Sequence, residues 1–290
     1  MRPAPLLLLT TVTTTTVHAS DALWDFLPEL PSTSEISIGG GLDSVGGWSR
    51  NTALTLEAPA ATLIFLSTGE SNIESDRSSL RTRYWNAAFS TDPAQAVSVG
   101  IAYDKQDSDD AIDIDGISIT LAFNTERFSF SLTPGRRDLS FSLNHRLRAK
   151  REAPIIDSRD ILASASWFAT TDWTISATYR SANYSKDMKR LAADPRLQLA
   201  LSPETLQLST GLEKRRLTIG VQHYFPQLDT GLEWSRSLSA VDNSAADSTT
   251  LLASKALSRS WRIDASTGIS RTDYNADTIF FGNISVAYLW

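Results

Sequence analysis

The sequence contains no cysteine, which excludes disulfide frameworks and thiolate metal sites. It has only three histidines, few for a hydrolase or a metal centre. Its formal net charge of -6 argues against a nucleic-acid binder, because such proteins usually carry a basic stripe. Long hydrophobic runs are also missing beyond the N-terminus. The longest, APAATLIFL, is interrupted by a proline and is shorter than the roughly 18 residues of a membrane-spanning helix. We therefore do not expect a helical inner-membrane protein.

The N-terminus has the features of an export signal. Arg2 supplies a positive charge, a short threonine-rich apolar core follows, and Val17 and Ala19 have the spacing that a signal peptidase requires. We expect residues 1–19 to be a cleaved signal peptide and residues 20–33 to be a short periplasmic lead. The remaining residues, 34–290, then form the folded domain.

Short segments with a period of two follow one another from residue 34 to the end. In DWTISATYRS, for example, Trp173 and Ile175 alternate with Thr174 and Ser176, and RRLTIGVQHY and QLDTGLEWS show the same alternation. Turn-forming residues separate these segments, as in STDPA and FNTER. A period of two predicts β-strands with two chemically different faces, so the fold class is all-β.

The composition of the two faces indicates which all-β architecture is present. The polar faces consist mainly of small residues (Ser, Thr, Gly, Ala and Asn), and aromatic residues lie near the strand ends. These aromatic residues are Trp85, Tyr103, Trp167, Trp173, Tyr179, Trp234, Trp261 and Trp290. A small, polar inner face and aromatic girdles are typical of a transmembrane barrel, whereas a soluble sandwich turns large aliphatic residues inward. We predict a transmembrane antiparallel up-and-down β-barrel.

The C-terminal segment NISVAYLW resembles the β-signal of Gram-negative outer-membrane barrels. Asn283, Tyr288 and Trp290 fit the polar and aromatic positions of that signal, and Ser285 stands at the position of its glycine. The resemblance implies location in the outer membrane of a Gram-negative bacterium and contact with outer-membrane lipid and lipopolysaccharide. It also implies insertion by the barrel-assembly machinery, and it points to a porin-like barrel without identifying a specific family.

The number of strands follows from the alternating segments. Seventeen candidates are found, at 34–42, 52–58, 61–68, 80–89, 95–104, 112–123, 127–133, 138–146, 160–169, 172–181, 196–201, 205–213, 215–224, 227–237, 248–257, 260–270 and 278–290. Single-chain bacterial barrels have an even number of strands. We therefore predict about 16 strands, with 18 as the alternative. The spacing of the segments predicts short loops and no plug domain.

Charged residues on the small, polar strand faces are the candidate functional residues, because those faces are expected to line the lumen. This set is Glu57, Arg81, Arg83, Asp104, Arg180, Glu213, Asp229, Glu233, Arg262 and Asp264. Such residues can select among ions and small solutes, or they can hydrate and brace the wall. Since the set contains both signs, we expect a weak ion preference.

Other candidate chemistry is weaker. His145 lies near Ser140 and Ser142, but the alternation puts it on the opposite strand face from these serines, which argues against a nucleophile–base pair and an enzyme. The acidic stretch 104–115 is either a solvated external loop or a divalent-cation site, and the first is favoured because the glycine and glutamate of a calcium loop are missing. The basic stretch Arg146 to Arg151 contacts lipid phosphates or forms a solvated turn. No cofactor, metal or nucleic-acid partner is predicted.

Two functions fit these features. The first is a porin-like channel for passive diffusion of ions or small hydrophilic solutes, because a barrel this wide is not filled by small inward side chains. The alternative is a scaffold or sheath whose lumen encloses a partner protein or a secreted polymer. The short loops favour the sheath. The absence of any partner-binding extension other than the lead, which contains Trp24 and Phe26, favours the channel.

Overall fold

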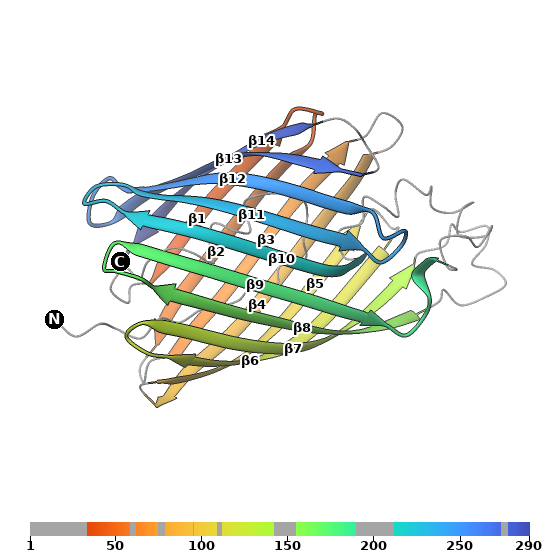
Figure 1. Cartoon of the computed structure of the whole chain (residues 1–290), viewed down its shortest axis with the longest axis horizontal. Helices are drawn as coiled ribbons and strands as arrows, with labels where there is room; N and C mark the ends of the chain where they lie inside the picture. The colour runs from red at the N-terminus through yellow and green to blue at the C-terminus, as the bar shows by residue number, and fades with distance from the viewer. Residues whose placement is uncertain are drawn as a thin grey trace.

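The computed structural model describes residues 34–58, 62–74, 79–94, 96–108, 112–141, 155–189, 212–273 and 278–290. The predicted signal peptide and the predicted lead lie outside these ranges. Within the described ranges, the chain forms fourteen antiparallel strands closed into one barrel (Figure 1). The strands are β1 (Glu35–Asp43), β2 (Trp48–Ala58), β3 (Thr62–Glu74), β4 (Ser79–Ala94), β5 (Val97–Ser108), β6 (Ile112–Asn124), β7 (Phe128–Phe141), β8 (Ile155–Phe168), β9 (Trp173–Tyr184), β10 (Glu213–Tyr224), β11 (Asp229–Ser239), β12 (Ala245–Ala256), β13 (Trp261–Thr272) and β14 (Ile279–Leu289).

The predicted strand number of 16, or alternatively 18, is wrong. The candidate at 127–133 and the described part of the candidate at 138–146, which ends at Phe141, belong to one strand, β7, because Pro134 and Gly135 lie inside it instead of forming a turn. The β6–β7 register skips from the pair Ser118–Gly135 to the pair Leu121–Leu132, and the missing N–H of Pro134 accounts for the break. The candidate at 196–201 and most of that at 205–213 lie outside the described residues.

The topology is the simplest one available to a closed barrel. Each strand pairs with its neighbours in sequence, and β1 pairs with β14 from Glu35–Leu289 to Asp43–Phe281. The start of β1 and the end of β14 therefore lie at the same end of the barrel, together with the short connections at 59–61, 125–127, 169–172, 225–228 and 257–260. Strands β7 and β9 end at the opposite end of the barrel, and the connections that follow them, 142–154 and 185–212, have the most residues, so the prediction of short loops fails there. In outer-membrane barrels the short turns face the periplasm, which makes the end with the long connections the external one.

The outer face of the barrel is an apolar band. Large hydrophobic side chains on it are widely exposed, among them Ile117, Phe123 and Leu251, each more than half accessible. Stacked aromatic residues mark its periplasmic side: Trp261 packs against Tyr288, with ring centroids 5.0 Å apart, and Tyr288 stacks on Trp290 at 6.0 Å. Such a band with aromatic girdles is the surface that a barrel presents to lipid.

Among the described residues, no helix is long and apolar enough to cross a membrane.

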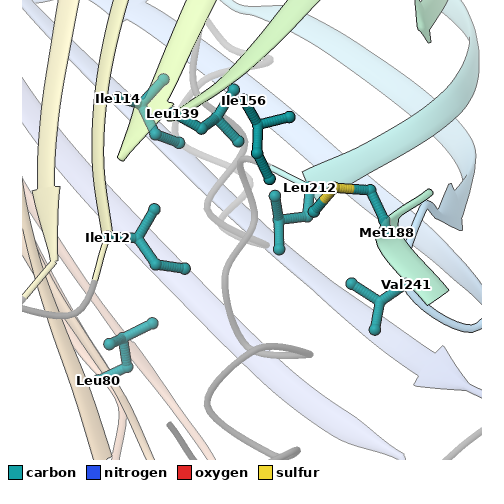
Figure 2. Packing of buried hydrophobic residues seen from close by; sticks show 8 residues of the cluster. All are labelled: Leu80, Ile112, Ile114, Leu139, Ile156, Met188, Leu212 and Val241. Atoms are coloured by element: carbon teal, nitrogen blue, oxygen red, sulfur yellow. The ribbon is translucent and has the colours of Figure 1, made fainter. Parts of the chain in front are cut away.

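The inner face is small and polar along most of the barrel. Its residues are largely buried serine and threonine, such as Ser131, Ser164 and Thr250. The exception is a hydrophobic cluster at the external end, formed by inward side chains of several strands and by residues of the external connections (Figure 2). The cluster consists of Leu80, Ile112, Ile114, Leu139, Ile156, Met188, Leu212 and Val241. The cluster of fully buried apolar side chains is therefore a local feature of the external rim, and the rest of the lumen wall is mainly polar, with single apolar residues such as Phe65, Leu252 and Leu289 among the polar ones.

Candidate functional site: the charged lumen wall

Four charged residues form a network on the inner face, directly on the periplasmic side of the hydrophobic cluster. Nε of Arg137 on β7 lies 3.6 Å from Asp104 on β5 and 3.8 Å from Asp160 on β8. A terminal nitrogen of Arg180 on β9 lies 2.8 Å from Asp160. The four side chains are at most 10% exposed. We refer to Asp104, Arg137, Asp160 and Arg180 as the external charge network. Its charges alternate in sign around the wall, so each carboxylate faces at least one guanidinium.

Two glycines make room for this network. The register places Gly116 between Asp104 and Arg137, and a Cβ atom at residue 116 would collide with the Asp104 carboxylate. Gly135 plays the same part for Asp160, whose Oδ1 lies 2.6 Å from the position of a Cβ atom at residue 135. Because both glycines lack a side chain, the two carboxylates can lie flat across the neighbouring strand toward Arg137.

The external charge network retains unused hydrogen-bonding capacity. All three guanidinium nitrogens of Arg137 and both carboxylate oxygens of Asp104 are buried, yet none forms a hydrogen bond within the described part of the chain. The distances from Arg137 to its carboxylates, 3.6 and 3.8 Å, are ion-pair distances and too long for hydrogen bonds. Buried donors and acceptors are normally satisfied. This part of the wall therefore presents groups able to bind water, an ion or a polar solute.

A second group of charges lies near the periplasmic mouth. Arg262 on β13 contacts Glu35 on β1 at 2.9 Å and Asp264 on its own strand at 3.0 Å. Ser254 donates a 2.6 Å hydrogen bond to Asp264. The contact between Arg262 and Glu35 passes over β14 at Ala287, whose small side chain is fully buried. This periplasmic charge group is thus satisfied by short contacts, unlike Arg137 and Asp104.

The inner faces of β10 and β11 carry further acidic groups. Glu213 contacts Arg216 at 2.5 Å. On β11, Asp229 and Glu233 lie on the same face as Gly231, and the register directs that face inward. Glu233 is 6% exposed, and its Oε2 atom has no hydrogen-bond partner among the described residues.

The structure can be compared residue by residue with the predicted lumen set. The register puts most of that set on the inner face: Glu57, Asp104, Arg180, Glu213, Asp229, Glu233, Arg262 and Asp264. Glu57 lies at the periplasmic mouth and is exposed. Arg81 and Arg83 are different. They share a face of β4 with Trp85 and Phe89, which are 44% and 45% exposed, while the opposite face carries the buried Thr82. The prediction that Arg81 and Arg83 face the lumen is therefore wrong.

Sequence reasoning missed several inward charges. Arg137 lies between two of the predicted strands, 127–133 and 138–146, and Asp160 is the first residue of the predicted strand 160–169, whereas the structure places them inside β7 and β8. Arg216 and Glu35 also line the lumen. The inward acids of the described strands outnumber the inward arginines Arg137, Arg180, Arg216 and Arg262. These acids are Glu35, Asp43, Glu57, Asp92, Asp104, Asp160, Glu213, Asp229, Glu233 and Asp264.

The acidic stretch at 104–115 is not a single loop, since it contains the end of β5 and the start of β6. Its carboxylates also divide between the two faces of the wall. Asp104 points inward to Arg137, while Asp115 lies on the outer face and accepts a 2.7 Å hydrogen bond from Tyr103. Among the described residues, no group of histidine and acidic side chains is arranged to hold a metal ion. His145 and the basic stretch 146–151 lie outside the described residues.

The residues of the predicted assembly signal occupy both faces of β14. Asn283 and Ser285 pair with inward residues of β1, while Tyr288 and Trp290 lie on the lipid-facing side. Their role in insertion remains a prediction.

No family model matches the chain, and no curated relative matches it. Solved structures do match. A monoaromatic hydrocarbon channel, CymD, is 8% identical, with 89% of this chain and 88% of that chain covered at a TM-score of 0.56. An anion-selective porin from Comamonas acidovorans is 8% identical, with coverages of 89% and 99% and a TM-score of 0.50. At such low identity the likeness concerns the fold alone.

The closed barrel, its exposed apolar band and its polar lumen define the class of a transmembrane β-barrel. Its fold is that of outer-membrane porins and channels. The chain is an outer-membrane β-barrel of porin-like fold, with no more specific family assigned.

Proposed function

We propose that this barrel is a channel for passive diffusion of ions or small hydrophilic solutes across the outer membrane. The observation that carries the proposal is the polar inner face, which presents buried hydroxyl groups along the wall and charged groups at two heights. A barrel of fourteen strands is wider than the eight-stranded barrels whose side chains fill the interior. Polar side chains along such a lumen replace part of the hydration of a passing ion or solute.

The chemistry of the wall favours hydrophilic over apolar solutes. CymD has a similar fold and is described as a channel for monoaromatic hydrocarbons. A hydrocarbon path requires apolar side chains over a continuous length of wall. In the present barrel the inward apolar side chains outside the external cluster, such as Phe65, Leu252 and Leu289, are separated by polar residues, and the residues next to the cluster on its periplasmic side are Asp104, Arg137 and Asp160. A polar or charged solute fits this arrangement better.

The excess of inward acids gives the channel a preference for cations. This preference is stronger than the weak one expected from sequence, because two arginines of the predicted lumen set, Arg81 and Arg83, lie on the outer face. Positive ions are concentrated in a lumen whose wall carries net negative charge, and salt screens the effect.

The test is conductance of the purified barrel in planar lipid bilayers. We expect stable single-channel steps and a reversal potential that indicates cation preference in a salt gradient. Replacing Asp229→Asn and Glu233→Gln together removes two inward charges and is expected to shift the reversal potential toward anions. Arg236→Gln is the matched control, since Arg236 lies on the outer face of the same strand and should leave selectivity unchanged.

A silent barrel would contradict the channel proposal, as would one that conducts only after a tightly bound partner is removed. The second result would instead support the alternative function, a sheath around a partner protein or a secreted polymer. Unchanged selectivity in the double variant, with normal conductance, would show that β11 does not line the conducting path.

A further inference from the structure

Three arginines surround one glutamate on the outer face of the barrel, near its external end. Glu70 on β3 accepts hydrogen bonds from Arg50 on β2, at 2.6 and 3.0 Å, and from Arg83 on β4, at 3.2 Å. Arg81 also donates to Glu70. We call Arg50, Glu70, Arg81 and Arg83 the outer basic cluster. Three cations meet a single carboxylate here, so the cluster carries an excess of two positive charges.

The Glu70 carboxylate holds the three arginines in place but leaves their side chains exposed. The Glu70 side chain is 8% exposed, whereas the side chains of Arg50, Arg81 and Arg83 are 70%, 42% and 55% exposed. Arg83 contacts Glu70 through Nε alone, so its two terminal nitrogens are not used by the carboxylate. The ring of Trp48 lies 5.8 Å from the guanidinium of Arg50 and 5.9 Å from that of Arg81, which restrains both side chains further. The cluster is thus a preorganised array of exposed donors.

The outward neighbours of the cluster on β5 add no net charge to it. On the outer face of β5, Asp107 lies opposite Arg83 and Lys105 lies opposite Trp85. These two charges cancel. Elsewhere around the barrel, Arg136 contacts two acids, Asp138 and Asp157. Arg236 and Arg271 both lie opposite a single acid, Asp247. The outer basic cluster differs from these groups in having three arginines around one carboxylate.

The height of the cluster identifies the level of the membrane that it faces. On β4, Arg83 lies one outward position beyond Trp85 toward the external end, and on β3 Glu70 lies beyond Leu66 and Thr68. Trp85 and Leu66 are both 44% exposed on the lipid-facing surface. Aromatic side chains gather where hydrocarbon meets headgroups, so the cluster lies just outside this boundary, at the headgroups of the external leaflet.

We infer that the outer basic cluster binds the phosphate groups of an anionic glycolipid of the external leaflet, of the lipopolysaccharide class. Arginine guanidinium groups pair with phosphate through two parallel hydrogen bonds, and three of them converge here at headgroup height. The acyl chains of the same lipid would lie against the apolar band below Trp85. The glycolipid is favoured over free phosphate because only a lipid uses both the cations and the apolar surface.

The experiment uses the full-length barrel in neutral-detergent micelles, titrated with diphosphorylated lipid A and followed by native mass spectrometry. The double variant Arg81→Gln, Arg83→Gln should weaken binding by about thirtyfold, because each basic side chain near an anionic surface contributes on the order of 1 kcal/mol. Arg236→Gln together with Arg271→Gln is the matched control, since both residues lie on the outer face of other strands at the external end, and should bind as the unmodified protein does.

Two further measurements separate the sources of phosphate. Dephosphorylated lipid A should bind at least tenfold more weakly than the diphosphorylated form, and inorganic phosphate at millimolar concentration should not compete. Equal binding of the two lipids, or an equal loss in the control variant, would overturn the proposal. Effective competition by inorganic phosphate would overturn it as well, since the cluster would then be a general anion site. A change in tryptophan emission on binding that disappears in Trp48→Phe would place the lipid at the cluster.

Discussion

Removing Arg137 should destabilise the barrel more than any nearby surface change, because its guanidinium compensates two buried carboxylates. At an effective dielectric constant of about 20, charges 3.6 and 3.8 Å apart attract by about 4 to 5 kcal/mol each, before the cost of burying them is subtracted. In Arg137→Met, Asp160 keeps Arg180 at 2.8 Å, but Asp104 loses the sole ion pair that the described residues provide. We expect a loss of about 3 kcal/mol in the free energy of unfolding, the low end for breaking a buried pair.

The assay is reversible urea unfolding of the barrel in lipid vesicles, with the folded fraction followed by heat-modifiable mobility on gels. The double-mutant cycle with Asp104→Asn provides the decisive comparison. Neutralising Asp104 in the Arg137→Met background should recover part of the loss, giving a coupling energy of about 1 to 3 kcal/mol. Arg136→Met, the adjacent but outward residue, should change stability little. Additive costs for Arg137→Met and Asp104→Asn would refute the argument, because they would show that the two charges are energetically independent.

The other predictions concern the wall and its closing strand. Gly116→Ala should displace the Asp104 carboxylate and cost about 1 to 3 kcal/mol in the same unfolding assay. Gly282→Ala should be tolerated because its nearest neighbour would lie 3.7 Å away, and equal effects would argue against the packing explanation. Deleting Trp290 should lower the amount of folded protein in the outer membrane, since Trp290 stacks on Tyr288 at the end of the closing strand. A normal folded level in membrane fractions would contradict that expectation.

The class of fold could be predicted from sequence because apolar and polar side chains alternate with a period of two, which shows which residues share each face of a strand. Trp173 and Ile175 face lipid in the structure, and Thr174 and Ser176 face the lumen, as their spacing indicates. The number of strands could not be obtained this way. Proline and glycine at 134–135 have the chemistry of a turn, but in the structure Pro134 lies inside β7, where the pairing with β6 is interrupted and the pairing with β8 continues.

The charged residues were harder to assign for a related reason. The rule that charges face the lumen holds only inside the hydrocarbon layer, and several strands extend beyond it. Arg81 and Arg83 lie in such an extension. These charged residues therefore lie on the outward face of β4, the same face as Trp85. Arg137 shows the opposite case: the strand face on which it lies could be assigned only once β7 was known to be one continuous strand. Contacts between strands, such as that of Arg137 with Asp104, depend on register, which a single sequence does not reveal.

Closure of the sheet determines when this protein stops exposing an unpaired strand edge that could associate with another chain. The strands from β2 to β13 pair only with their neighbours in sequence, whereas β1 can be fully paired only when β14 is present, and Glu35 of β1 contacts Arg262 of β13 across β14. Until the last strand arrives, β1 exposes a row of unpaired backbone groups that can recruit a strand from another chain. A chain interrupted anywhere before β14 would keep that open edge permanently. During secretion and insertion, β1 must therefore be kept from pairing with other chains until β14 is available to pair with it.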